Sequence, residues 1–184
     1  MEKPDPGASR VLRMELLVGP IWRIRTAESL VLLNLELGRL QGLSGTFHAG
    51  WIVAPDRSAV AVDDFPIGGG VVARRRFGER RIWGSVGVTA GILVHRASTD
   101  LGPVHRVDPD IRLPIRLYWT AEPVGLSVAL LQGFSFRTRT YYERGIEVWR
   151  RIPYRIGFAV GLHFDAGLGR GKPRRATHRR GDKP

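Results

Sequence analysis

The chain has 184 residues, a formal net charge of +12 and no cysteine. This length is typical of one domain with a sizeable core, and the lack of cysteine excludes disulfides, thiol catalysis and thiolate zinc sites. No run of eighteen apolar residues occurs, so a membrane-spanning helix is excluded.

Both ends of the chain differ in composition from its middle. Residues 1–9 are polar and rich in proline, with no apolar signal core behind them. Residues 170–183 carry seven basic side chains against one acidic side chain, so about half of the net charge belongs to this tail. We therefore expect a polar segment at 1–9, one β domain at 10–165 and a basic disordered tail at 166–184.

Between these ends, large apolar residues recur at every second position, which is the side-chain period of a strand. The clearest case is Tyr154 to Phe164, eleven residues that are long enough to cross a bilayer when tilted. Pro114 predicts a bulge or a local loss of pairing. The leucines of 30–40 also fit a helix. In chain order, the predicted strands lie at 11–18, 32–38, 47–53, 67–74, 82–95, 111–119, 124–130 and 154–164.

The connections between these strands alternate in length along the chain. Short ones are expected at 41–45, 77–80 and 121–122. Long ones are expected at 19–29, 55–64, 96–107 and 136–152, although 21–25 could continue the first strand. This alternation predicts an up-and-down barrel with short turns and both chain ends at one rim.

The two faces of the strands differ in residue size. One face is mostly Ile, Val, Leu and Phe, with Trp51, Trp119 and Tyr154 near strand ends, as in an aromatic girdle that meets lipid. The other face is mostly Gly, Ala, Ser and Thr, which suits the narrow interior of eight strands. We predict that a polar cluster plugs this lumen with salt bridges, with a pore as the alternative. Its members are Arg13, Glu15, Asn34, Glu36, His48, Arg74, His95, Arg112, Arg116, Arg155 and His163.

These patterns predict an all-β fold, an eight-stranded antiparallel up-and-down barrel of the transmembrane type. A soluble β-barrel that binds an apolar ligand or an anionic polymer alternates in the same way and stays open as the alternative.

The last predicted strand resembles the closing strand of small bacterial outer-membrane β-barrels, in a polar-x-Gly-x-x-apolar-x-apolar pattern. The residues of this assembly signal are Arg155, Gly157, Val160, Leu162 and Phe164. More loosely, residues 147–157 resemble uncharacterised deltaproteobacterial outer-membrane barrels. The resemblance implies an outer-membrane location, lipid contact, the barrel assembly machinery as a partner and no particular activity. Such a protein needs an export signal and usually stops at its last strand, and this chain departs from both.

Several groups of residues invite a chemical interpretation. His48, His95 and His163 share the small-residue face and could ligate zinc if they converged, but isolated lumen histidines are the expectation. Ser98 with His95 or His105 offers the atoms of a lipid hydrolase, without visible triad geometry. We expect no catalytic residue, no cofactor and no metal.

The basic segments have two interpretations. The arginines at 74–76 and 80–81 could clamp phosphates of a nucleic acid, but no stacking aromatic platform accompanies them, so nucleic acid is not the expected partner. A basic rim at lipid headgroups is the expectation. The tail would be a solvated extension, with basic residues Lys172, Arg174, Arg175, Arg179 and Arg180.

Overall fold

The computed structural model describes residues 10–24, 26–55, 61–77, 81–99, 102–121, 124–143 and 145–168. The predicted polar segment at 1–9 lies outside these residues, as does the basic tail from residue 169 on. Within the described ranges, no helix is long and apolar enough to cross a membrane.

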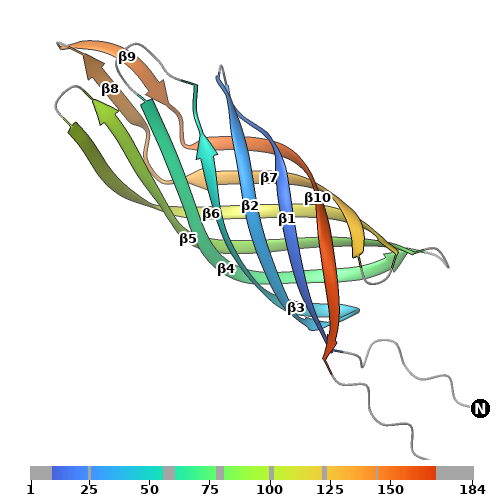
Figure 1. Ribbon diagram of the computed structural model, residues 1–184. Coiled ribbons are helices and arrows are strands. Elements are labelled where there is room, and N and C mark those ends of the chain that lie inside the picture. The colour runs from blue at the N-terminus through green and yellow to red at the C-terminus, as the bar shows by residue number, and fades with distance from the viewer. Residues whose placement is uncertain are drawn as a thin grey trace, which may run out of the picture.

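Eight long strands close into one barrel, and a separate two-stranded hairpin follows the seventh of them in the chain and extends from one end of the barrel (Figure 1). Neighbouring barrel strands are antiparallel, in the order β1-β10-β7-β6-β5-β4-β3-β2. The barrel strands are β1 (Arg10–Arg23), β2 (Thr26–Arg39), β3 (Gly42–Val53), β4 (Ala61–Phe77), β5 (Ile82–Thr99), β6 (Gly102–Ala121), β7 (Val124–Ser135) and β10 (Tyr154–Leu168). The hairpin consists of β8 (Arg139–Glu143) and β9 (Ile146–Arg151).

The barrel closes where β1 pairs with β10, from Arg10 opposite Leu168 to Trp22 opposite Ile156. This closure confirms the predicted eight-stranded antiparallel barrel. The first and last barrel strands end at the same rim as the β2–β3 connection, which we call the terminal rim (Figure 1). The β8–β9 hairpin lies at the opposite end, the hairpin rim.

Two of the predicted long loops are wrong. Residues 19–23 belong to β1 and residues 26–29 to β2, and Ile24, which follows β1, has a φ of 40°. Residues 96–99 and 102–107 belong to β5 and β6, whose ladder still pairs Arg96 with His105. Backbone hydrogen bonds hold neighbouring strands together whatever their side chains are, so the pairing continues where the alternation of apolar residues stops. The β5–β6 extension, residues 96–99 with 102–107, is called the arm below.

The two other predicted long loops are partly strand. β4 already begins at Ala61, inside the expected loop 55–64, and the expected loop 136–152 contains the β8–β9 hairpin. β10 runs to Leu168, beyond the expected end of the domain at 165. The predicted loss of pairing at Pro114 is confirmed on the β5 side, where the ladder is interrupted between the pairs Val86–Ile115 and Thr89–Arg112 without a change of register.

Glycines allow two pairs of strands to approach closely. A Cβ on Gly70 would lie 2.1 Å from the carbonyl oxygen of Val88, and a Cβ on Gly161 would lie 2.0 Å from that of Leu16. No side chain fits at such a distance. The β4–β5 and β1–β10 contacts therefore depend on glycine at these positions.

Candidate functional site

The outer surface of the barrel is an apolar belt. Val88, Val128 and Phe158, from β5, β7 and β10, are 45%, 38% and 46% exposed and point away from the interior. Trp51 and Tyr154 lie on the same surface toward the hairpin rim, and aromatic residues near strand ends are typical of a membrane–water interface. In a soluble barrel these side chains would point inward.

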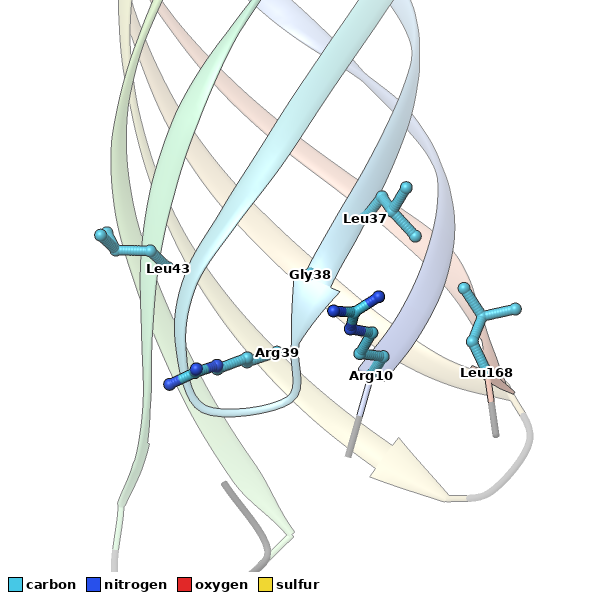
Figure 2. Close-up of a pocket in the computed structure, with 6 residues that line it drawn as sticks. All are labelled: Arg10, Leu37, Gly38, Arg39, Leu43 and Leu168. Carbon is cyan, nitrogen blue, oxygen red and sulfur yellow. The ribbon is translucent and has the colours of Figure 1, made fainter. Parts of the chain in front are cut away.

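A groove lies on this surface at the terminal rim (Figure 2). It has a volume of about 520 Å³ and lies at the ends of β1, β2, β3 and β10. Its lining residues are Arg10, Leu37, Gly38, Arg39, Leu43 and Leu168.

The interior is arranged in layers, as the inward-facing residues of β1 show. Above Val11 at the terminal rim these include Arg13 and Glu15, then Leu17 and Ile21, then Arg23, and all six are buried. β2 repeats the order in reverse, with Glu36 and Asn34, then Leu32 and Leu30, then Glu28. An apolar layer therefore separates two polar regions.

The polar region nearest the terminal rim is the basal cluster, formed by Arg13, Glu15, Asn34, Glu36, Arg74, Arg116, Tyr118 and Asp165. Glu36 is its centre, because it pairs with Arg74 and accepts hydrogen bonds from Arg116 Nη1 at 2.8 Å and from the Tyr118 hydroxyl at 3.1 Å. Arg13 makes a bidentate pair with Asp165, at 2.6 and 2.5 Å. Three guanidinium groups meet three carboxylates, so the formal charge of the cluster is balanced.

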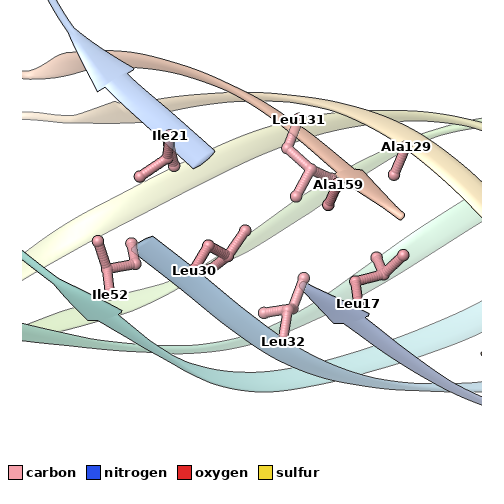
Figure 3. Close-up of a cluster of buried hydrophobic side chains, with 8 residues drawn as sticks. All are labelled: Leu17, Ile21, Leu30, Leu32, Ile52, Ala129, Leu131 and Ala159. Carbon is pink, nitrogen blue, oxygen red and sulfur yellow. The ribbon is translucent and has the colours of Figure 1, made fainter. Parts of the chain in front are cut away.

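The apolar layer crosses the barrel above the basal cluster (Figure 3). Its side chains come from β1, β2, β3, β7 and β10 and point toward one another. They are Leu17, Ile21, Leu30, Leu32, Ile52, Ala129, Leu131 and Ala159. The prediction that small and polar residues fill the lumen is therefore wrong for its middle, which packed leucines and isoleucines occupy.

A trio of charged residues lies between the apolar layer and the hairpin rim. Arg155 Nη2 donates to both carboxylate oxygens of Asp110, at 2.5 and 2.6 Å, and Arg112 Nε donates to the same carboxylate at 2.9 Å. Gly133 leaves the space for Arg155, since a Cβ there would lie 2.7 Å from Arg155 Nε. Two cations share one carboxylate, so this trio carries the excess positive charge of the lumen.

The upper cluster lies at the hairpin rim and consists of Arg23, Glu28, Asp64, His95, Asp108, Arg139 and Arg151. His95 lies between two carboxylates, with Nδ1 2.6 Å from Asp64 Oδ1 and Nε2 2.9 Å from Asp108 Oδ2. Arg23 Nη2 donates to Asp64 at 2.6 Å. As in the basal cluster, three arginines match three carboxylates.

The β8–β9 hairpin is bound to this cluster by its own arginines. Arg151 donates to Glu28 at 2.7 Å and to Asp64 at 2.8 Å, and Arg139 Nε donates to Asp108 at 2.8 Å. Burial alone would lower the pKa of Arg151, but these two carboxylates raise it above its ordinary value, so the guanidinium stays charged.

An apolar contact also holds the hairpin. Trp149 is 7% exposed and packs with Ala54, Val62 and Ala97 on the inner side of the barrel wall, with Tyr141 beside it. The hairpin therefore docks on the inside of the rim through both ion pairs and apolar burial.

All eleven residues of the predicted lumen cluster are buried in the interior. They do not form one cluster, because nine of them are divided among the basal cluster, the Asp110 trio and the upper cluster, and His48 and His163 lie outside all three. Of the three histidines, His95 lies in the upper cluster, His48 is buried on β3, and His163 contacts Thr120 and the edge of Tyr118 near the terminal rim. Among the described residues, no three His, Cys, Asp or Glu side chains lie close enough to hold a metal ion.

The sequence interpretation missed most of the upper cluster and part of the other two. The missed residues are Arg23, Glu28, Asp64, Asp108, Asp110, Tyr118, Arg139, Arg151 and Asp165. Several of them lie in segments that the sequence pattern predicts to be loops. The alternation of inward and outward side chains along β6 could have identified some of them, because Asp108 and Asp110 lie at the same alternate positions as the inward Arg112 and Arg116.

The side chains proposed for a lipid hydrolase, Ser98 with His95 or His105, are not arranged as a nucleophile and its base. His95 faces the interior, whereas Ser98 is exposed on the other face of β5. Within the described ranges, no hydrogen bond joins Ser98 to His95 or His105. The arginine run at 74–76 is also divided, because Arg74 points inward to Glu36 and Arg76 lies 5.8 Å from the ring of Trp83.

Comparison with solved structures identifies the architecture. The chain is similar to Neisserial surface protein A, with a TM-score of 0.62 and 9% identity over 84% of this chain and 96% of that one. The fold is that of a small outer-membrane β-barrel. No protein-family model and no curated protein matches the sequence significantly.

Two further structures share this barrel. The N-terminal barrel domain of Pseudomonas aeruginosa OprF has a TM-score of 0.50 and 9% identity, over 84% of this chain and 97% of that one. Ail, the attachment invasion locus protein of Yersinia pestis, was also solved with the heparin analogue sucrose octasulfate. That structure has a TM-score of 0.51 and 9% identity, over 86% of this chain and 99% of that one.

Proposed function

We propose that this protein spans a bacterial outer membrane, with the terminal rim toward the periplasm and the hairpin rim outside the cell. The observation that carries the proposal is the inverted distribution of side chains. Apolar residues cover the outside and ion-paired residues fill the inside, which suits a barrel surrounded by lipid. The short β2–β3 turn at the terminal rim agrees with this orientation.

The lumen serves as a structural plug and does not conduct. Eight strands leave a narrow interior, and here the basal cluster, the apolar layer and the upper cluster follow one another along it. The docked hairpin covers the upper cluster. This arrangement favours a structural or interaction role over that of a pore.

The arm and the β8–β9 hairpin are the surfaces for an interaction outside the cell, and we propose an anionic polymer as the partner. Exposed arginines on them and beside them are Arg96, Arg106, Arg137 and Arg150. The described carboxylates near them are fewer, since Asp63 bonds to Trp51 and Glu147 pairs with Arg150. The complex of Ail with a sulfated sugar is a precedent for this class of partner in the same fold.

Assembly of the barrel would use the signal proposed for β10. Val160, Leu162 and Phe164 point outward on this strand, and Arg155 and Gly157 point inward. β10 pairs with β1 to close the barrel, so the barrel assembly machinery would act on the strand that completes the fold.

The membrane location is tested with the full chain expressed in a Gram-negative host. We expect the protein in the detergent-extracted outer-membrane fraction, and a different gel mobility before and after boiling. In a planar bilayer it should give no stable conductance. Purification from the soluble fraction without detergent would instead support the soluble barrel.

The interaction role is tested with heparin as the probe, on the protein in detergent micelles. Substitution of Arg96, Arg106 and Arg137 by glutamine should weaken binding at low salt, and salt should weaken binding by the unmodified chain. Substitution of Arg75 and Arg81, at the terminal rim, is the matched control. Equal heparin binding by both sets of variants would contradict the assignment to the arm and hairpin.

A further inference from the structure

The groove at the terminal rim combines positive charge with apolar walls. Arg10 and Arg39 are opposite each other on β1 and β2, and Leu168 is opposite Arg10 on β10. Leu37 lies one step above Arg39 on the same outward face, and Leu43 lies across the β2–β3 turn (Figure 2). Two arginines and three leucines therefore line a groove with a volume of about 520 Å³.

The charged and apolar residues of the groove are arranged like the headgroup and acyl-chain regions of a membrane. The arginines lie at the last residues of the wall, where β1 begins and β2 ends. From this level the outward face of β1 continues through Leu12, Met14 and Leu16 into the apolar belt. A ligand aligned with the barrel would thus meet charge at the rim and leucine above it.

The two arginines lack a counterion within the described part of the chain. Directly opposite like charges destabilise a strand pair, and neither Arg10 nor Arg39 forms an ion pair there. The nearest carboxylate along β10, Asp165, is bound inside the barrel by Arg13. An anion between Arg10 and Arg39 would relieve this repulsion.

We propose that this groove binds one anionic phospholipid of the periplasmic leaflet. Its phosphate lies between Arg10 and Arg39, and an acyl chain passes over Leu37, Leu43 and Leu168 toward the apolar belt. The inference rests on the proposed membrane location and adds a specific lipid site to it. A free phosphate has no group to contact the three leucines, so the site favours the lipid over inorganic phosphate.

The test is native mass spectrometry of the full chain in detergent, with phosphatidylglycerol added. We expect one retained lipid per barrel. The R10Q/R39Q variant should bind about thirtyfold more weakly, because each arginine near an anionic lipid contributes about fivefold. The R75Q/R81Q variant removes two exposed arginines from the same rim and should bind as the unmodified chain does. Excess inorganic phosphate should not displace the lipid.

A second variant fills the groove without changing its charge. Gly45 lies on the outward face opposite Leu37, and a Cβ there would meet only the Leu37 carbonyl oxygen at 3.7 Å. Gly45→Trp should therefore fold and lose the retained lipid. Equal lipid retention in R10Q/R39Q and R75Q/R81Q, or in Gly45→Trp and the unmodified chain, would overturn the proposal.

Gel mobility before and after boiling separates this failure from that of the proposed function. A barrel that is heat-modifiable and inserts into vesicles but retains no lipid contradicts the groove alone. A chain that needs no detergent contradicts the membrane location itself.

Discussion

At the scale of single residues, Glu36 determines whether the basal cluster is balanced. It pairs with Arg74 and Arg116 and accepts from Tyr118, and its side chain is completely buried. Loss of one partner from a buried ion pair is strongly destabilising, because the remaining charge has no compensation. Glu36→Gln should therefore lower the free energy of unfolding by about 3–5 kcal/mol. Urea unfolding in phospholipid bilayers, followed by heat-modifiable gel mobility, measures this.

An exposed ion pair provides the control for this substitution. Glu147 pairs with Arg150 at 2.9 Å, with side chains 39% and 59% exposed. Exposed pairs contribute about 0–1 kcal/mol, so Glu147→Gln should unfold at nearly the same urea concentration as the unmodified chain. Equal losses in the two variants would show that Glu36 does not have the proposed central role.

Glycine at a close strand contact is a second residue-scale determinant. Gly70→Ala places a Cβ 2.1 Å from the Val88 carbonyl oxygen, so β4 and β5 must move apart. We expect a lower yield of folded barrel, measured as the heat-modifiable fraction after refolding into detergent. Gly45→Ala, with only the Leu37 oxygen at 3.7 Å, is the matched control and should refold normally. Normal refolding of Gly70→Ala would mean that the two strands can separate at little cost.

At the scale of elements, the β8–β9 hairpin depends on Arg151 for its docking. Arg151→Gln leaves Glu28 and Asp64 with one fewer charged partner each. The loss of a buried partner costs about 3–5 kcal/mol, so the undocked hairpin becomes far more populated. We expect faster chymotrypsin cleavage after Trp149 and Tyr141, which pack together in the docked state.

Arg150 is the neighbouring control for this prediction. Its side chain is 59% exposed, and it forms an ion pair with the exposed Glu147. Arg150→Gln should leave the rate of chymotrypsin cleavage unchanged. If Arg151→Gln and Arg150→Gln were cleaved at the same rate, the ion pairs would not be what holds the hairpin.

The strands also show which features could be predicted from the sequence. Ile111 to Trp119 was predictable, because one face meets an apolar medium and the other does not. The arm was missed, because its backbone pairing continues where large apolar residues no longer alternate along the strands, as at Arg96 and His105. The docking of Arg151 was not predictable, since it joins β9 to β2 and β4 across distant parts of the chain.

At the scale of the whole molecule, the alternation of side chains along each strand predicts which residues face the interior, but it does not predict which of them contact one another. Residue type and alternation indicated that Glu36 and Arg116 share the lumen. They did not indicate that Leu17 and Leu32 form a layer above them, because leucine also fits the outer face. The stagger of the closed barrel decides which inward residues reach the same height, and a single strand does not carry that information.

Closure of the barrel gives the last prediction. β1 pairs with β10 along one edge, starting at Arg10 opposite Leu168, and with β2 along its other edge. The β1–β2 pairs therefore cannot substitute for lost β1–β10 pairs. A chain truncated after Leu168 keeps every β10 pair and the Arg13–Asp165 ion pair, so it should fold and show heat-modifiable mobility. A chain truncated after Ala159 loses the partners of residues 10–18 and leaves an open sheet edge, which favours aggregation. Folding of the shorter chain, or failure of the longer one, would contradict closure by the β1–β10 pair as the step that completes the barrel.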